Sequence, residues 1–101
     1  MNNVSIIGRL GNDPEMKYFE SGKAKTKINV AVKGIKKDEV IWVEVQAWDK
    51  LAELIGEYFK KGSQIGINGR LAIDEWEQEG QKKSKTYIIA ENIDFLGKKE
   101  N

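Results

Sequence analysis

Hydrophobic and polar residues alternate over much of this chain, with the period of two that predicts β-strands. The alternation is clearest at residues 24–33, where one side carries Ala24, Thr26, Ile28, Val30 and Val32. Similar runs predict strands at residues 4–10, 41–48, 65–73, 86–90 and 93–96, with extended chain at 15–19. A break in the alternation at Glu91-Asn92 predicts a β-bulge between the last two runs.

One segment has the period of a helix instead. Apolar residues at i, i+3, i+4, i+7 and i+8 form a single stripe, namely Leu51, Leu54, Ile55, Tyr58 and Phe59. This spacing predicts a helix whose apolar stripe, both aromatic rings included, packs into the core. Asp49 is the predicted N-cap, and Gly62 is the predicted left-handed residue after the last turn.

Residues 41–48 carry the most informative pattern. The odd positions are all aliphatic and are expected to face the core, whereas Trp42 and Trp48 lie among the even positions with Glu44 and Gln46 between them. Because successive side chains of a strand point to opposite faces, both rings are expected on the wetter face, about 20 Å apart. Such rings suit stacking against unpaired nucleic-acid bases. Alternatively, a neighbouring loop or subunit covers both rings, and the strand alone leaves the two interpretations open.

The order of the predicted elements is three strands, one helix and two strands, which favours an all-β fold, the five-stranded OB barrel. The helix would lie between strands three and four. The polar residues 74–85, centred on Glu79-Gly80-Gln81, predict a long hairpin between strands four and five. We expect one OB domain over residues 1–97 and a short disordered end at residues 98–101.

An OB barrel binds its ligand on one face, flanked by the loops after strands one and four. Trp76 lies on the predicted long hairpin, so it would join Trp42 and Trp48 on that face. A hairpin of two strands is too narrow to bury an indole ring by itself. The convergence of three rings favours base stacking over packing of Trp76 against a second subunit.

Basic residues near this face are candidate phosphate contacts. Lysine runs in loops are usually only solvated, but here they flank an aromatic strand, as in proteins that bind single strands. The candidates from the residue pattern are Trp42, Trp48, Trp76, Lys33, Lys36, Lys37, Lys82, Lys83 and Lys85. Arg9, Lys50, Lys61 and Arg70 are individually uninformative.

Composition narrows the class of function. The 101 residues include 17 basic and 16 acidic side chains, so the net charge of +1 does not by itself indicate an anionic partner. The chain has no cysteine and no histidine, which excludes disulfides and thiolate metal sites and removes the commonest general base. No acid/base pair or dinucleotide-binding motif is recognisable, so we predict a non-enzyme without cofactor or metal. No run is apolar over the length of a membrane span, and the N-terminus has no signal-peptide pattern, which together predict a cytoplasmic protein.

Four longer motifs can be compared with known families. They are Gly8-Arg9-Leu10-Gly11-Asn12-Asp13-Pro14-Glu15-Met16-Lys17-Tyr18, Lys50-Leu51-Ala52-Glu53, Tyr58-Phe59-Lys60-Lys61-Gly62-Ser63-Gln64 and Gly69-Arg70-Leu71. Together they resemble the bacterial-type single-stranded DNA-binding protein family over residues 2–97. The resemblance implies an OB fold that wraps single-stranded DNA without strong sequence preference, usually as a homotetramer. It also implies roles in replication, recombination and repair, in the bacterial nucleoid or its organellar equivalent.

The resemblance also assigns residues. The family's aromatic stacking positions fall on Trp42, Trp48 and Trp76. Basic positions of the family match Lys50 and Lys61, which together with Arg70 complete the candidate nucleic-acid-binding set. The first strand offers apolar residues and free backbone for pairing with its counterpart in a second subunit. The predicted subunit-interface residues are Val4, Ile6, Gly8 and Leu10.

The chain departs from many family members in three ways. Ile35 or Lys36 stands where they carry a fourth aromatic residue, in a loop that is shorter here. Glu44, Asp74 and Glu75 stand where they carry basic residues, so we expect stacking to carry more of the affinity here, with a shallower dependence on salt. The family's Gly/Pro/Gln-rich tail, whose acidic tip recruits partner proteins, has no counterpart in this sequence, which is expected to be either a cut-down core or a natural tailless form.

Two other classes of OB protein remain open from the sequence. An OB-type primosomal replication protein would be a tailless dimer that mainly docks partner proteins. The retention of all three tryptophans argues against it, and the oligomeric state would help to separate the two. An oligosaccharide-binding or purely structural OB module would not respond to oligo-dT, whereas a single-strand binder would show a change in tryptophan fluorescence.

Overall fold

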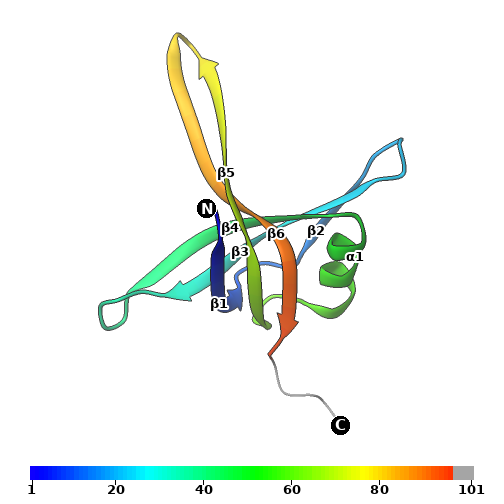
Figure 1. Cartoon of the computed structure of the whole chain (residues 1–101), viewed down its shortest axis with the longest axis vertical. Coiled ribbons are helices and arrows are strands. Elements are labelled where there is room, and N and C mark those ends of the chain that lie inside the picture. The colour runs from blue at the N-terminus through cyan, green and yellow to red at the C-terminus, as the bar shows by residue number, and fades with distance from the viewer. Residues whose placement is uncertain (97–101) are drawn as a thin grey trace.

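The computed structural model describes residues 1–96, in which six strands and one helix form a mostly β fold (Figure 1). The elements in chain order are β1 (Val4–Leu10), β2 (Glu15–Tyr18), β3 (Ala24–Lys33), β4 (Val40–Trp48), α1 (Asp49–Tyr58), β5 (Gln64–Gln78) and β6 (Gln81–Phe95). The predicted end at residues 98–101 lies outside the described residues. Within residues 1–96, no helix is both long enough and apolar enough to span a bilayer.

Five of the strands close into a barrel. They follow the order β1-β5-β6-β4-β3, and β1 then pairs back with β3, where Gly8 lies opposite Val32 and Leu10 opposite Val30. The β4–β6 pairing is parallel, while the other pairings of the ring are antiparallel. The short strand β2 pairs with β3 outside the ring. The predicted five-stranded OB barrel, with its helix between barrel strands three and four, is therefore confirmed.

Three hairpins extend outward from the barrel: β5–β6, β3–β4 and β2–β3 (Figure 1). The β5–β6 hairpin is the longest, and it turns through Glu79 and Gly80 with φ angles of 52° and 78°. Two consecutive positive φ angles are the signature of a type I′ turn, whose twist matches that of the flanking strands. This confirms the predicted long hairpin. The predicted bulge is also present, because Asn68 pairs with Asn92 and Gly69 with Ala90, which leaves Glu91 unpaired.

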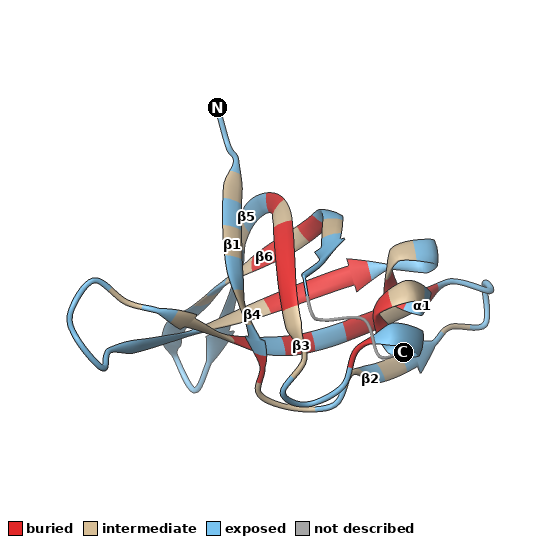
Figure 2. Cartoon of the chain, turned by 90° about the horizontal axis from the view of Figure 1, so that it is seen from below, coloured by how far each residue is buried: buried red, intermediate tan, exposed pale blue. Residues whose placement is uncertain are grey.

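The hydrophobic core lies inside the ring and beneath α1. Its fully enclosed side chains include Ile28 and Val30 of β3, Val45 of β4, Ile55 of α1 and Ile65 of β5. Figure 2 shows that the buried segments gather where the strands form the barrel and beside α1, whereas the projecting hairpins are exposed along most of their length. The predicted alternation of β3 is confirmed throughout its buried half.

Two positions of β4 depart from the predicted alternation. Ile41, expected in the core, is 47% exposed because it lies near the β3–β4 turn, away from the barrel centre where Val45 pairs with Ile88. Gln46, expected on the wetter face, is buried because it lies at the junction of β4 with β6. Its side-chain N–H donates to Glu44 Oε2 at 2.9 Å, which satisfies the buried amide.

The ends of the helix also differ from the prediction. Asp49 does not cap the helix with its side chain, because its Oδ1 accepts a hydrogen bond from the Ala24 N–H at 3.2 Å. Gly62 has the expected positive φ of 91°, but it lies in the turn before β5, beyond the C-cap Phe59. Phe59 is buried as predicted. Tyr58, however, is 59% exposed and packs edge-on against the Phe95 ring with 5.6 Å between the centroids.

Candidate nucleic-acid interface

Strand register places all three tryptophans on the same face of the sheet. Trp42 and Trp48 lie on the outer side of β4, and that side continues onto β6 because Gln46 pairs with Ile89. From Ile89 the same side runs along the β5–β6 hairpin in steps of two residues, to the pair formed by Trp76 and Lys83. The rings therefore share one outer surface, although they come from segments far apart in the sequence. We call this surface the outer face.

All three rings are accessible in the chain. Trp42 is 63% exposed, Trp48 is 39% exposed and Trp76 is 44% exposed. The prediction that Trp42 and Trp48 face solvent is confirmed. Large exposed aromatic side chains on one surface contribute little to this chain's own core, and their faces are available to stack against planar ligands.

The Trp42 ring rests on the turn between β1 and β2. A Cβ atom built on Gly11 would lie 2.3 Å from Cζ3 of the Trp42 ring, so the ring is seated where a side chain at residue 11 would stand. The turn itself is tied to β3, because the Gly11 N–H donates to the Asn29 carbonyl and the Asn29 N–H donates to Asn12 Oδ1. This arrangement fixes the position of the most exposed of the three rings.

Trp48 lies in an aromatic and cationic cluster. The Phe19 ring, just after β2, stacks on Trp48 with 5.9 Å between the centroids and 17° between the planes. Lys25 Nζ lies 5.2 Å from the centroid of the Trp48 ring, and Lys17 Nζ lies 5.3 Å from that of Phe19. Phe19 therefore covers part of Trp48, which explains why Trp48 is less exposed than Trp42.

An ion pair joins β4, the strand of Trp42 and Trp48, to β6 of the β5–β6 hairpin. Lys85 Nζ is 3.2 Å from Glu44 Oε2, and the Glu44 side chain is only 17% exposed. Burial raises the pKa of Glu44, but hydrogen bonds from Gln46 and Lys85 and the charges of Lys85 and Lys27 outweigh it and leave the pKa below its ordinary value. Nearby, Asp74 accepts a 3.0 Å hydrogen bond from the Tyr87 hydroxyl, which raises the pKa of Tyr87.

A groove of about 440 Å³ runs between β2–β3 and the base of the β5–β6 hairpin. Its walls are rich in cations, and the lining residues are Glu15, Met16, Lys17, Lys25, Lys27, Gln46, Asp74 and Lys85. The groove lies beside the Trp48 cluster, where Lys17 and Lys25 line it, and it reaches β5 at Asp74. Its four lysines suit an anionic ligand that lies between the Trp48 cluster and the base of the β5–β6 hairpin.

Comparison with known proteins decides the family. Residues 1–96 match the Single-strand binding protein family. The chain belongs to this family. Its members are non-enzymatic DNA-binding proteins, and the match confirms both the resemblance found in the sequence and single-stranded DNA binding as the function.

Individual relatives agree with the family assignment. "Single-stranded DNA-binding protein 1" of Synechocystis sp. is 44% identical over 106 residues, covering 100% of this chain and 88% of the relative. "Single-stranded DNA-binding protein 1" of Nostoc sp. is 40% identical over 104 residues, covering 100% of this chain and 87% of the relative. The "Single-stranded DNA-binding protein" of Treponema pallidum is 38% identical, with coverage of 96% of this chain and 58% of the relative.

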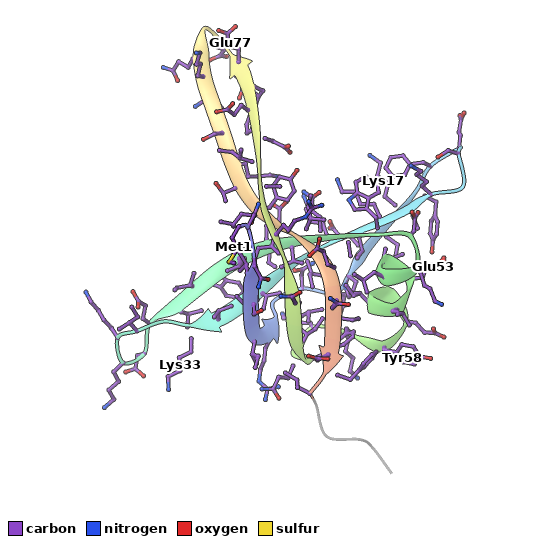
Figure 3. The ribbon with its side chains drawn as sticks, in the orientation of Figure 1. Met1, Lys17, Lys33, Glu53, Tyr58 and Glu77 are labelled. Atoms are coloured by element: carbon purple, nitrogen blue, oxygen red, sulfur yellow. The ribbon has the colours of Figure 1, made fainter. Side chains whose placement is uncertain are left out.

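Several of the basic residues predicted to contact phosphates lie on or near the outer face. Lys83 is the register partner of Trp76, and Lys85 faces Glu44 across the β4–β6 junction. Lys33 ends β3, two residues beyond Ala31, the register partner of Trp42 (Figure 3). Lys82 lies on the same hairpin, but on the side opposite to Lys83, because successive side chains alternate. Lys36 and Lys37 lie in the turn between β3 and β4.

Other predicted basic residues lie elsewhere or are already paired. Lys50 lies in the first turn of α1, and Lys61 lies beyond the helix, where its backbone N–H donates to Asp13 Oδ1. Neither belongs to a strand, so the register does not place them on the outer face. Arg70 is on that face, but its Nε lies 3.0 Å from Glu91 Oε2.

The predicted interface strand β1 is largely occupied within its own barrel. Residues from Val4 to Arg9 pair with β5, and Gly8 to Leu10 also pair with β3. Leu10 is buried in the core, whereas Val4 and Ile6 are partly buried against it. The expectation of a free backbone along the whole strand is therefore wrong for Gly8 and Leu10. The edge facing away from β5 is unpaired only at residues 4–7 of the described chain.

Sequence reasoning missed the aromatic and cationic cluster around Trp48. The alternation of residues 24–33 leaves Lys25 and Lys27 on the side away from the core, and Phe19 follows Lys17 at the two-residue spacing of a strand. Those signals indicate only the strand face on which each side chain lies, not which side chains meet. The missing information was the register that places Lys25 opposite Trp48 and Lys17 opposite Lys25.

Proposed function

We propose that this chain binds single-stranded DNA by stacking bases on Trp42, Trp48 and Trp76 along its outer face. The observation that carries the proposal is the strand register, which sets three accessible indole rings on one surface. Every base has a π-face, so stacking of this kind gives little preference for sequence. Binding would therefore protect single strands of any sequence.

Phosphate contacts would come from basic residues at both ends of this surface. Lys33, Lys36 and Lys37 lie toward the β3–β4 turn, and Lys82, Lys83 and Lys85 lie on the β5–β6 hairpin. Lys50, Lys61 and Arg70 are included as further contacts on the basis of the family resemblance. Each phosphate neutralised on a single strand adds about −0.7 to the slope of log affinity against log salt.

The assembly we propose is a homotetramer. An unpaired strand edge is a ready surface for pairing with another chain. The edge at residues 4–7 of β1 has this character, and Ile7 within it is 58% exposed. Pairing of two such edges would give a dimer, and association of two dimers would give the tetramer. Sedimentation or light scattering that finds an 11.5 kDa monomer at micromolar concentration would reject this assembly.

The cellular role follows from the ligand. A protein of this kind coats the single strands exposed during replication, recombination and repair. We therefore expect it to localise with the DNA, in the bacterial nucleoid or its organellar equivalent. Two relatives that align with the whole of this chain carry the name "Single-stranded DNA-binding protein 1". A protein of the same fold that acted mainly as a docking module would not need three exposed rings on one surface.

A tryptophan-fluorescence titration tests the proposal. Oligo-dT should quench the intrinsic emission strongly, because stacked bases contact the indoles, whereas duplex DNA or an oligosaccharide should change it much less. Trp42→Ala, Trp48→Ala and Trp76→Ala should each weaken binding without unfolding the protein. Unchanged emission with oligo-dT, together with unfolding of these variants, would show instead that the rings serve the fold.

A further inference from the structure

Phe19 is an aromatic residue at the outer face that the proposed stacking of bases on three tryptophans does not use. Its ring lies nearly parallel to Trp48, at 17° and 5.9 Å between centroids, so the two rings form one extended aromatic surface. Phe19 stands at the end of β2, and its N–H donates to the Lys23 carbonyl, which closes the β2–β3 turn. The turn thus holds a second flat apolar ring beside Trp48.

Two of the cations beside these rings carry like charges at directly opposite positions of neighbouring strands. Lys17 of β2 is the register partner of Lys25 of β3, and both ammonium groups lie over aromatic rings. Like charges directly opposite each other across two strands are destabilising. Lys27 follows on the same side of β3 and lines the same groove. A phosphate between Lys17 and Lys25 would remove the repulsion.

Figure 3 shows Lys17 near the projecting β2–β3 hairpin, on the side of the barrel away from Lys33. The groove that Lys17, Lys25 and Lys27 line continues to Lys85 at the base of the β5–β6 hairpin. It therefore joins the Trp48 end of β4 to the hairpin that carries Trp76. A strand of DNA that stacks on both tryptophans has a direct route through these cations.

We propose that Phe19 is a fourth base-stacking residue, acting with Trp48 as one platform, and that Lys17, Lys25 and Lys27 bind the phosphates between this platform and Trp76. The inference rests on the proposed single-stranded DNA site and deepens it. It assigns the path of the DNA to the β2–β3 hairpin as well as to β4 and the long hairpin. In this arrangement the cations of β2 and β3 offset the negative charge that Glu44 places on β4.

The test uses the whole chain with two probes of equal length, oligo-dT and an abasic oligonucleotide. Phe19→Leu keeps an apolar side chain but removes the ring, so it should weaken oligo-dT binding on the order of tenfold and leave abasic binding unchanged. Lys17→Gln combined with Lys25→Gln should weaken both probes and make the salt slope shallower by about 0.7 for each phosphate that these lysines neutralise. Matched controls away from the groove, Tyr58→Leu on α1 and Lys60→Gln after it, should behave as the unmodified chain.

A direct contact is separated from a structural role by photocrosslinking. Oligo-dT carrying 5-iodo-deoxyuridine should crosslink to Phe19 in the unmodified chain, with the site read by mass spectrometry. Normal oligo-dT affinity in Phe19→Leu, or weaker binding with no crosslink at Phe19, would overturn the inference while leaving the three-tryptophan site in place. Failure of the unmodified chain to bind oligo-dT would overturn both proposals.

Discussion

Glu44 of β4 and Lys85 of β6 form an ion pair within the outer face, with 3.2 Å between Oε2 and Nζ. Gln46 donates to the same carboxylate oxygen at 2.9 Å, so the carboxylate is held in place from two sides. Pairing with Glu44 engages the Lys85 ammonium group, which could otherwise bind a phosphate. Glu44 therefore limits the positive charge available on the surface that carries the three tryptophans.

Removing the charge of Glu44 should strengthen binding of single-stranded DNA at low salt. Glu44→Gln keeps an acceptor for Gln46 but frees Lys85 for one more phosphate, so the slope of log affinity against log salt should steepen by about 0.7. Oligo-dT titrations over a salt series measure both quantities. Glu53→Gln on α1 (Figure 3) is the matched control and should change neither. Unaltered affinity and slope in Glu44→Gln would place the DNA path away from this ion pair.

The same pair predicts a dependence of stability on pH. Because the folded chain holds the pKa of Glu44 below its ordinary value of 4.5, ionised Glu44 stabilises the fold above that pH. The contribution is lost as the pH falls through the lower folded value. Thermal unfolding should therefore show the unmodified chain more stable than Glu44→Gln near neutral pH, with a difference that shrinks in acid. A difference that stayed constant from neutral pH to below pH 4.5 would contradict the ionic origin of this stabilisation.

Gly11 is predicted to position Trp42 for stacking. A methyl group at residue 11 would collide with the Trp42 ring, at 2.3 Å from its Cζ3 atom, so Gly11→Ala should displace the ring. We expect a loss of oligo-dT affinity of about 1–3 kcal/mol at most, the value of one stacked base, with a changed tryptophan emission and a folded barrel. In a double-mutant cycle, Gly11→Ala should add little to Trp42→Ala. Fully additive losses would show that residue 11 acts on binding by another route.

Trp48→Ala should separate binding from stability. The ring lies outside the core and loses mainly its stacking on Phe19, a cost of about 0.5–1.5 kcal/mol to the free energy of unfolding. Oligo-dT binding should weaken by about 1–3 kcal/mol. Ile28→Ala, at a fully buried position, provides the opposite control and should cost about 2–5 kcal/mol of unfolding free energy. Denaturant unfolding and fluorescence titration together distinguish the two effects, and a larger loss of stability in Trp48→Ala than in Ile28→Ala would refute this assignment.

The local pattern of the sequence determined the features that depend on one element at a time. Period two alone set Trp42 and Trp48 on the side of β4 away from Val45 and Ala47, because successive side chains of any strand point to opposite faces. The polar run around Glu79-Gly80 likewise determined the long hairpin, since these residues tolerate the positive φ angles of its turn. The motifs shared with the family were also readable before any tertiary contact was known.

Only the tertiary structure decided which of these features meet. Whether Trp76 joins the face of Trp42 depends on the parity of two pairings, β4 with β6 and β6 with β5, and a shift of one residue in either would send the ring to the opposite side. The contacts of Phe19 with Trp48 and of Glu44 with Lys85 arise from the same long-range register. Closure of the ring also buried Gln46 and left Ile41 exposed, because burial depends on which strands lie alongside a residue, and no local alternation encodes its neighbours.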